Sequence, residues 1–307
     1  MHRRSLQRVD YLLLVTLAAI WGSSFLFIKL AVATIPPMTL TAARLVLAAA
    51  GLLLVMWARG QRLPRDAKIW RDFAIVAVVG NAVPFYLINW GQVTIDAGLA
   101  AILMATMPLA SVLLAHLFIH DDRLTIGKGV GMVVGFSGIV VLVGPDALAG
   151  LGLEVVAQLA VAFAACCYAV ANVYTRGGRM RELPPAVNGA GVLICAAVVT
   201  IPFSLAMDRP WALSPSAESM LALAALALMC TSAAYLILFR LLSTRGVTFV
   251  ALLNYQVPVF GVVWGALFLG EAVEMSALAA LGLILLGIAL AQARARSAVP
   301  APQSRES

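Results

Sequence analysis

A long apolar segment interrupted by a single proline occurs twice in this chain, at positions about 150 residues apart. The first copy runs from Ala97 to Asp121 around Pro108, and the second copy surrounds Pro258 and ends at Glu271. A chain that repeats such a segment is predicted to consist of two related halves. A shift of 150 residues aligns Ala101, Leu103, Pro108, Val112, Leu117 and Phe118 with Ala251, Leu253, Pro258, Val262, Leu267 and Phe268.

Each proline has a predictable effect on its helix. It removes the hydrogen bond to the carbonyl four residues earlier, here that of Met104 or Asn254. In lipid, such a carbonyl must be satisfied by protein or by water in a cavity. Paired interrupted segments in the two halves of a membrane protein are typical of a transport site, so we predict that Pro108 and Pro258 act as hinges. The alternative is two similar kinked helices that only pack.

The composition predicts an all-α polytopic membrane protein. The chain is 63% hydrophobic and 11% charged, whereas soluble domains carry about 25% charged residues. About 20 apolar residues are needed to cross a bilayer. We predict ten such segments, at residues 11–32, 39–58, 71–92, 97–119, 126–144, 153–175, 186–206, 218–239, 247–269 and 276–293.

The basic charges predict how these segments are oriented. With the N-terminus inside, 18 of the 21 Lys and Arg residues fall on the inner side, and the outer loops hold only Arg209. This asymmetry is the positive-inside rule, and it predicts that both termini lie in the cytoplasm. The excess of seven positive charges is therefore expected to contact anionic lipid head groups and not nucleic acid.

The two halves are predicted to have opposite orientations in the membrane. Each half holds five segments, and an odd number inverts the second half relative to the first. Further pairs support the repeat, since Trp21 and Tyr168 are 147 positions apart and a Pro-Pro pair recurs at an interval of 148. We predict a first five-helix repeat at 1–145, an inverted second repeat at 146–296 and a disordered tail at 297–307.

Nothing in the sequence predicts an enzyme. There is no HExxH motif, no pair of intramembrane carboxylates and no phosphate-binding loop. The four cysteines lie in apolar segments without the spacing of a metal site or a disulfide framework. We therefore expect no catalytic residue, no cofactor and no metal.

The fifth segment carries two glycine patterns. Gly127, Gly131 and Gly135 at four-residue spacing predict close helix packing. The sequence from Gly135 to Gly138 matches the GxSG pattern of intramembrane serine proteases. None of the three histidines lies in a helix after Ser137, where such a protease carries its base, so we discount this match.

Polar and aromatic side chains recur at helical spacing within the apolar segments. Asn81, Phe85, Ile88 and Gln92, for example, share one helical face. Such faces either line a binding cavity or form hydrogen bonds between helices. The residues we predict to bind substrate are Trp21, Ser24, Asn81, Phe85, Tyr86, Asn89, Tyr168, Asn172, Tyr235, Asn254, Tyr255 and Gln256.

Lys29 and Arg44 are the only two cations that lie neither in a loop nor at the inner end of a segment. An ionisable residue within the membrane is a functional hypothesis by default. Either residue lies in an outer cavity that attracts an anionic group, such as a substrate carboxylate, or it has a structural role. In the structural alternative, Lys29 reaches the outer interface and Arg44 donates to freed carbonyls at helix ends.

Several of these features together resemble the drug/metabolite transporter superfamily, specifically its EamA-type members. They are Trp21-Gly22 followed by Lys29, a Pro-Pro pair before Arg44, and two proline helices that each end in Phe and an acid. The resemblance covers residues 10 to 293 and is greatest to bacterial exporters of amino acids, including aromatic amino acids. It implies a central cavity formed mainly by helices one, three, four, six, eight and nine, with helices five and ten at the periphery.

These observations predict a multi-pass transporter of the bacterial inner membrane that exports small amphipathic metabolites, above all amino acids, by alternating access. A monomer would contain a complete pathway. No acid lies in mid-membrane, so we expect no coupling through a buried carboxylate. The alternatives are a multidrug exporter of organic cations or an importer of a related metabolite, and a receptor or scaffold is a further class.

Overall fold

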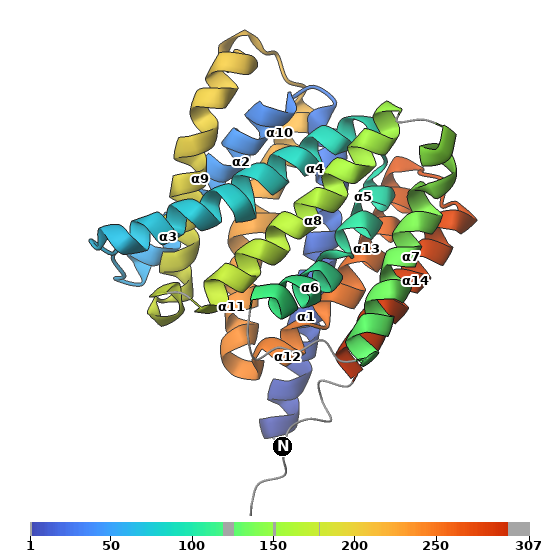
Figure 1. Cartoon of the computed structure of the whole chain (residues 1–307). Helices are drawn as coiled ribbons and strands as arrows, with labels where there is room; N and C mark the ends of the chain where they lie inside the picture. The colour runs from blue at the N-terminus through green and yellow to red at the C-terminus, as the bar shows by residue number, and fades with distance from the viewer. Residues whose placement is uncertain (1, 119–125, 150–151, 178, 294–307) are drawn as a thin grey trace, which may run out of the picture.

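The computed structural model describes residues 2–118, 126–149, 152–177 and 179–293 of the 307-residue chain. Within these ranges every regular element is helical (Figure 1). The elements are α1 (His2–Val32), α2 (Pro37–Ala58), α3 (Ala67–Ala77), η1 (Val78–Ala82), α4 (Val83–Thr94), α5 (Ala97–Met104), α6 (Met107–Phe118), α7 (Ile126–Ala149), α8 (Leu153–Gly177), η2 (Arg179–Glu182), α9 (Pro185–Met207), η3 (Pro210–Ala212), α10 (Ala217–Ala224), η4 (Ala225–Ala233), α11 (Ala234–Arg245), α12 (Val247–Val250), α13 (Leu253–Leu269) and α14 (Met275–Ala293).

Seven helical stretches in the described residues are long and apolar enough to cross a membrane. They coincide with seven of the ten segments predicted from the sequence. The other three predicted segments contain shorter apolar helices, at Ile126–Leu142, Leu253–Leu269 and Met275–Ala291. The all-helical class is therefore confirmed, while the count of ten membrane crossings stays a prediction.

Local sequence explains where several of these helices begin. Pro37 and Pro185 each open a helix, at the position where the missing proline N–H costs no hydrogen bond. The Asp66 side chain accepts a 2.8 Å hydrogen bond from the backbone N–H of Lys68 and so caps α3. These three residues fix where α2, α9 and α3 begin.

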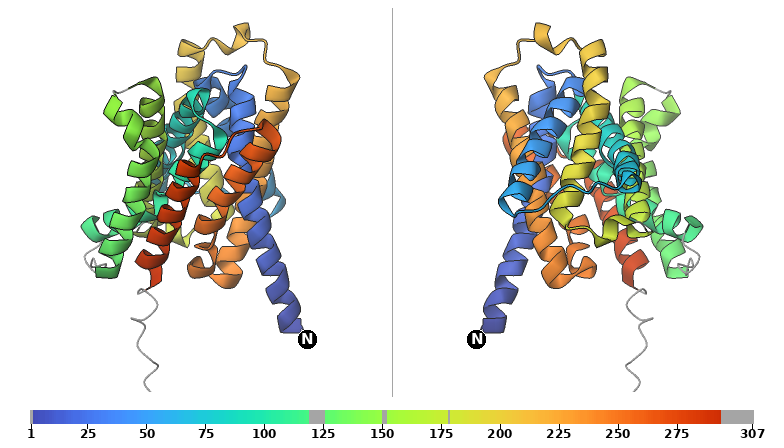
Figure 2. Two further views of the ribbon diagram at one scale, coloured as in Figure 1. Left: turned by 90° about the vertical axis from the view of Figure 1, so that its right-hand side faces the viewer. Right: turned by 90° about the vertical axis from the view of Figure 1, so that its left-hand side faces the viewer.

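Helices from the two halves of the chain pack against each other throughout the fold. The main pairs are α2 with α9, α1 with α13, α4 with α8 and α7 with α14. Figure 2 shows α7 and α14 side by side along one flank, and the start of α1 and the end of α14 both point to the lower end of the molecule. Neither half is a separate compact body.

The packing role predicted for glycines in the fifth segment is confirmed at the contact between α7 and α14. A Cβ added at Gly131 would lie 2.5 Å from the carbonyl oxygen of Gly287. A Cβ at Gly287 would in turn lie 2.5 Å from the carbonyl oxygen of Gly131. The two backbones therefore approach closely only because both positions lack a side chain.

The two proline-containing segments are both interrupted, but at different positions. The first breaks at Ala105 and Thr106, so that Pro108 is the second residue of α6. The second breaks at Ala251 and Leu252, well before Pro258, which lies inside α13. Tighter bonds, in which the acceptor lies three residues back, form at both breaks. The hinge role of the prolines stays a prediction.

Two π-helices, η1 and η4, lie inside the long helical stretches α3–α4 and α10–α11. Their first residues, Val78 and Ala225, are 147 positions apart, the interval that also relates Trp21 to Tyr168. In each, a side chain donates to a carbonyl five residues back: Asn81 to Val76 at 3.4 Å and Thr231 to Leu226 at 2.8 Å. Such bulges are frequent at functional sites.

Candidate functional site

A cavity of about 340 Å³ lies at the centre of the fold. Residues from both halves line it, contributed by α1, α2, α4, α5, α6, α8, η4, α11 and α13. Its walls are mainly aliphatic and aromatic, with a few polar groups at separate points. This combination of an apolar wall and few convergent polar groups is typical of sites for small organic molecules.

Seven of the twelve residues predicted to bind substrate line this cavity, together with Arg44 and both prolines. All six predicted helices that the family resemblance assigns to the cavity contribute lining residues, and the second predicted helix also contributes one, Arg44. The seven residues are Trp21, Ser24, Phe85, Tyr168, Asn172, Tyr235 and Asn254.

The other five predicted residues, Asn81, Tyr86, Asn89, Tyr255 and Gln256, lie outside this cavity lining. Asn89 is fully buried and donates a 2.9 Å hydrogen bond to the Thr41 hydroxyl, which joins α4 to α2. The Asn81 amide donates to the carbonyl of Val76 in α3, the helix just before its own π-helix, and the Gln256 amide donates to the carbonyl of Leu252. For these three amides, the structure favours the alternative in which the side chain forms hydrogen bonds within the protein and does not line a binding cavity.

Among the described residues that line the cavity, Arg44 is the only cation. Its side chain is buried, and its Nε donates a 3.2 Å hydrogen bond to the Thr231 hydroxyl. Its Cζ lies 4.1 Å from the centroid of the Phe85 ring, which is the geometry of a cation–π contact. Within the described ranges, the structure records no carboxylate at ion-pair distance from Arg44.

Thr231 was not among the predicted site residues. Its hydroxyl donates to the Leu226 carbonyl at 2.8 Å, which leaves the oxygen lone pairs facing the Arg44 donor. The backbone of the π-helix η4 sets this orientation. No pattern in the sequence marks a π-helix, so this contact was not predictable from residue spacing.

Two tyrosines also contribute to the polar part of the cavity. Tyr168 and Tyr235 both line it, and the ring of Tyr168 lies 6.4 Å from that of Phe85. For neither hydroxyl does the described part of the chain provide a recorded hydrogen-bond partner. Both groups are therefore available to a molecule in the cavity.

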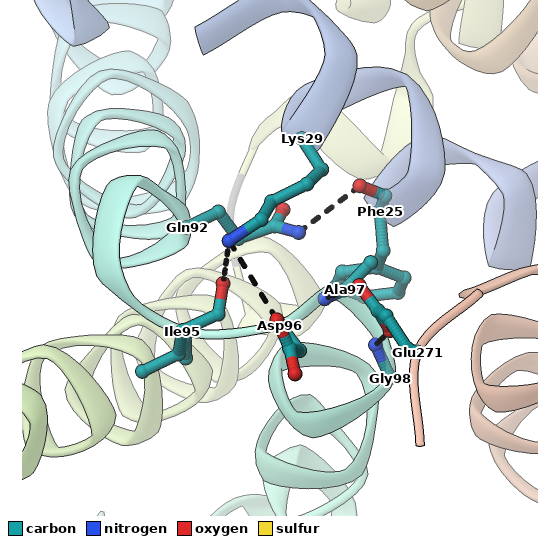
Figure 3. Close-up of polar contacts among 8 residues, drawn as sticks. All are labelled: Phe25, Lys29, Gln92, Ile95, Asp96, Ala97, Gly98 and Glu271. Carbon is teal, nitrogen blue, oxygen red and sulfur yellow. Dashed lines mark hydrogen bonds and ion pairs between the residues drawn. The ribbon is translucent and has the colours of Figure 1, made fainter. Parts of the chain in front are cut away.

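Lys29 lies outside the cavity, in a cluster of polar contacts near the end of α1 (Figure 3). Its Nζ donates to the carbonyl oxygen of Ile95 at 2.8 Å and lies 3.8 Å from the Asp96 carboxylate. Beside it, the Gln92 amide donates to the Phe25 carbonyl at 3.0 Å. These contacts tie α1 to the turn between α4 and α5 and favour a structural role for Lys29, by bonding within the protein and not by the predicted reach to the outer interface.

Glu271 lies across the first turn of α5 in the same cluster (Figure 3). Its two carboxylate oxygens accept hydrogen bonds from the backbone N–H groups of Ala97 and Gly98, at 2.7 and 2.9 Å. An acid at a helix N-terminus satisfies unpaired donors and complements the helix dipole. The sequence marked Glu271 as the end of the second repeated segment but gave it no role.

The family model of the EamA-like transporter family matches this chain over residues 9–144 and again over residues 155–292. The chain belongs to the EamA-like transporter family. This match confirms the resemblance to EamA-type members of the drug/metabolite transporter superfamily. With its apolar helices, it makes the chain a multi-pass membrane protein.

Two relatives and one solved structure carry the comparison further. The chain is 28% identical to the "Uncharacterized inner membrane transporter YedA" of Escherichia coli, over 90% of this chain and 88% of that protein. It is 33% identical to the "Probable terminal-alkyne amino-acid exporter" of Streptantibioticus cattleyicolor, over 42% of this chain and 43% of that protein. A crystal structure with 22% identity has the same fold, with a TM-score of 0.67 over 92% of this chain and 98% of that one.

The cavity of this EamA-like transporter can accept a small molecule that is apolar over most of its surface. Aromatic and aliphatic side chains from both halves supply the walls, and Arg44 with the two tyrosine hydroxyls supplies donors. No carboxylate is among the described residues that line the cavity.

Proposed function

We propose that this protein exports small amphipathic metabolites, with amino acids as the favoured class, by alternating access around the central cavity. The observation that carries the proposal is that both halves of the chain build one cavity with apolar walls and a few polar groups. A binding site at the interface of two repeats is the arrangement on which many secondary transporters depend.

The proposed architecture is ten transmembrane helices in two inverted repeats, at 1–145 and 146–296. Support comes from the family model, which matches the two parts of the chain separately. The helix pairs α2–α9 and α7–α14 offer further support, because each joins elements at equivalent places in the two parts. Inverted repeats allow two near-equivalent conformations, one open to each side of the membrane.

The proposed location is a bacterial inner membrane, with both termini in the cytoplasm. The distribution of basic residues supports this orientation, and the printed name of the relative YedA includes an inner membrane. The printed name of a second relative, an amino-acid exporter, favours export and amino acids. The proposed state is a monomer, and the cavity formed by residues from both halves of one chain supports it.

Export of organic cations is the alternative within transport, and import of a related metabolite is another. A lipophilic cation in a membrane cavity needs a counter-charge, and the described lining residues include no acid. Cations are therefore the less favoured class.

The test is flux through purified protein in liposomes, with radiolabelled phenylalanine, leucine, alanine and lysine, measured with and without a pH gradient. We expect saturable transport of the neutral amino acids that does not require the gradient. Protein-free liposomes and liposomes with the heat-denatured protein are the controls. Flux no greater than in these controls, for all four amino acids under every gradient, would overturn the amino-acid assignment.

A further inference from the structure

We infer that Arg44 binds the carboxylate of the transported molecule, so that this cavity selects molecules with one carboxylate and an apolar body. The inference rests on the proposed function in taking the central cavity as the transport site. It adds the chemical group that the site recognises and the residue that recognises it.

Arg44 has no counter-charge among the described residues. A cation removed from water costs several kcal/mol unless an opposite charge or hydrogen bonds compensate it. Lys29, the other cation that lies neither in a loop nor at the inner end of a segment, has the Asp96 carboxylate at 3.8 Å and a backbone carbonyl at 2.8 Å. Arg44 has one recorded hydrogen bond, to a neutral hydroxyl, and no carboxylate of the described residues lies at ion-pair distance from it.

Two contacts hold the Arg44 guanidinium in place. Thr231 accepts from its Nε, and the ring of Phe85 covers one face of its plane. Both contacts leave the two terminal nitrogens without a recorded partner in the described structure. A guanidinium presents these nitrogens as a planar fork that matches the two oxygens of a carboxylate.

A structural role for Arg44 would require acceptors from the protein. The alternative stated from the sequence was donation to carbonyls freed at helix ends. The recorded bond goes to a side-chain hydroxyl, and no backbone carbonyl in the described ranges accepts from Arg44. The position and the contacts of Arg44 therefore favour a hydrogen-bond acceptor that is part of the substrate.

The other lining groups fit the rest of such a molecule. The hydroxyls of Tyr168 and Tyr235 can donate to the same carboxylate or accept from a second polar group. The apolar body would meet aliphatic and aromatic walls, including Phe25, Ile28 and Ile88. An ammonium group finds no carboxylate among the described residues of the lining, so an amine alone is not the recognised group.

The experiment compares three probes of one shape in the purified protein: 3-phenylpropionate, 3-phenylpropanamide and 3-phenylpropylamine. Isothermal titration calorimetry in detergent, corrected by titration into detergent alone, gives each Kd. We expect 3-phenylpropionate to bind at least about tenfold more tightly than the amide or the amine, which is the scale of one hydrogen-bonded charge pair. Equal binding of the three probes, or no binding by any of them, would overturn the inference.

Variants of Arg44 test whether this residue causes the preference for 3-phenylpropionate. Arg44→Gln should abolish the preference for the acid, and Arg44→Lys should retain part of it, because lysine keeps the charge but not the planar fork. Arg240→Gln removes an exposed cation on α11 and should leave all three Kd values unchanged. If Arg44→Gln binds 3-phenylpropionate as the unmodified protein does, Arg44 is not the binding group.

Two further measurements keep this test separate from the proposed function. Should Arg44→Gln fail to fold, Phe85→Leu removes the ring that covers the guanidinium and should weaken binding of the acid more than binding of the amide. An equal loss for both would contradict the inference.

Flux is measured on its own: binding of the acid without saturable flux would remove the transport function and leave the Arg44 assignment in place.

Discussion

Glu271 and Ala97 lie 174 positions apart in the chain, yet the carboxylate of Glu271 accepts a 2.7 Å hydrogen bond from the Ala97 backbone N–H. The same carboxylate accepts a second bond from Gly98. Together these bonds fix the end of α13 to the start of α5, across the two halves of the chain (Figure 3). Any movement that separates α5 from the end of α13 must break both bonds.

Loss of this carboxylate is expected to destabilise the conformation described here. Glu271→Ala should lower the stability by about 1–2 kcal/mol, as for other helix N-caps, and Glu271→Gln by less, because the amide keeps one acceptor. The measurement is the thermal unfolding midpoint of the purified protein. Glu274→Gln, in the same loop, removes a charge whose recorded contact is with the neighbouring Ser276. That control should shift the midpoint little, and an equal shift for Glu274→Gln and Glu271→Gln would contradict the prediction.

Gly265 is expected to act through the same carboxylate. A Cβ at Gly265 would collide with Oε2 of Glu271, so Gly265→Ala should displace the cap and destabilise in the same direction. The combination of Gly265→Ala with Glu271→Ala should cost less than the sum of the two single variants, because both act on one contact. Thermal midpoints of the four proteins form a double-mutant cycle. Additive shifts would show that Gly265 and Glu271 act independently.

Two glycines on α14 form a matched pair, because Gly287 lies in the contact with α7 and Gly282 does not. Gly287→Ala should destabilise by about 1–3 kcal/mol, because the new methyl group would lie 2.5 Å from the Gly131 carbonyl oxygen. Gly282→Ala, also on α14, meets nothing within 4 Å and should be neutral or stabilising by up to about 1 kcal/mol. Thermal midpoints compare the two, and equal effects would contradict the close approach of the backbones.

Substitution of a residue that lines the cavity should change transport, whereas substitution of a buried residue outside the cavity should change stability. Tyr235→Phe removes a hydroxyl that faces the cavity, so it should alter KM for a transported amino acid by severalfold without a shift in thermal stability. Asn89→Leu leaves the Thr41 hydroxyl without its donor in a buried contact, which should cost about 1–3 kcal/mol of stability. Flux and thermal unfolding, measured on both variants, separate the two roles. The reverse pattern would place the site elsewhere.

The positions of the helices could be predicted from sequence because apolar length and charge placement are properties of each segment alone. The cavity was predicted less completely. Helical spacing identified the faces that carry Trp21 and Tyr168, but it could not tell which amides bond within the protein. Asn89 looked equivalent to Asn172 in the sequence, and only the structure shows that Thr41 accepts from it.

The contacts that no local pattern indicates are those between distant parts of the chain. Thr231 lies beside Arg44 because it belongs to the π-helix η4, which interrupts the helical stretch α10–α11. The Glu271 cap depends on α13 meeting α5, and on a glycine at position 265 that leaves room for the carboxylate. Such relationships require the packed fold.

The hydrogen bond between Arg44 and Thr231 joins residues 187 positions apart, and this separation has a consequence for how the protein is made. At about 5–20 residues per second, a ribosome needs roughly 10 to 40 s to add Thr231 after Arg44. During that interval, the guanidinium is in a chain that lacks its acceptor and also the lining residues that follow it, from Tyr235 to Pro258. The site is therefore completed late in synthesis, after α13 has been added to the helices made before it.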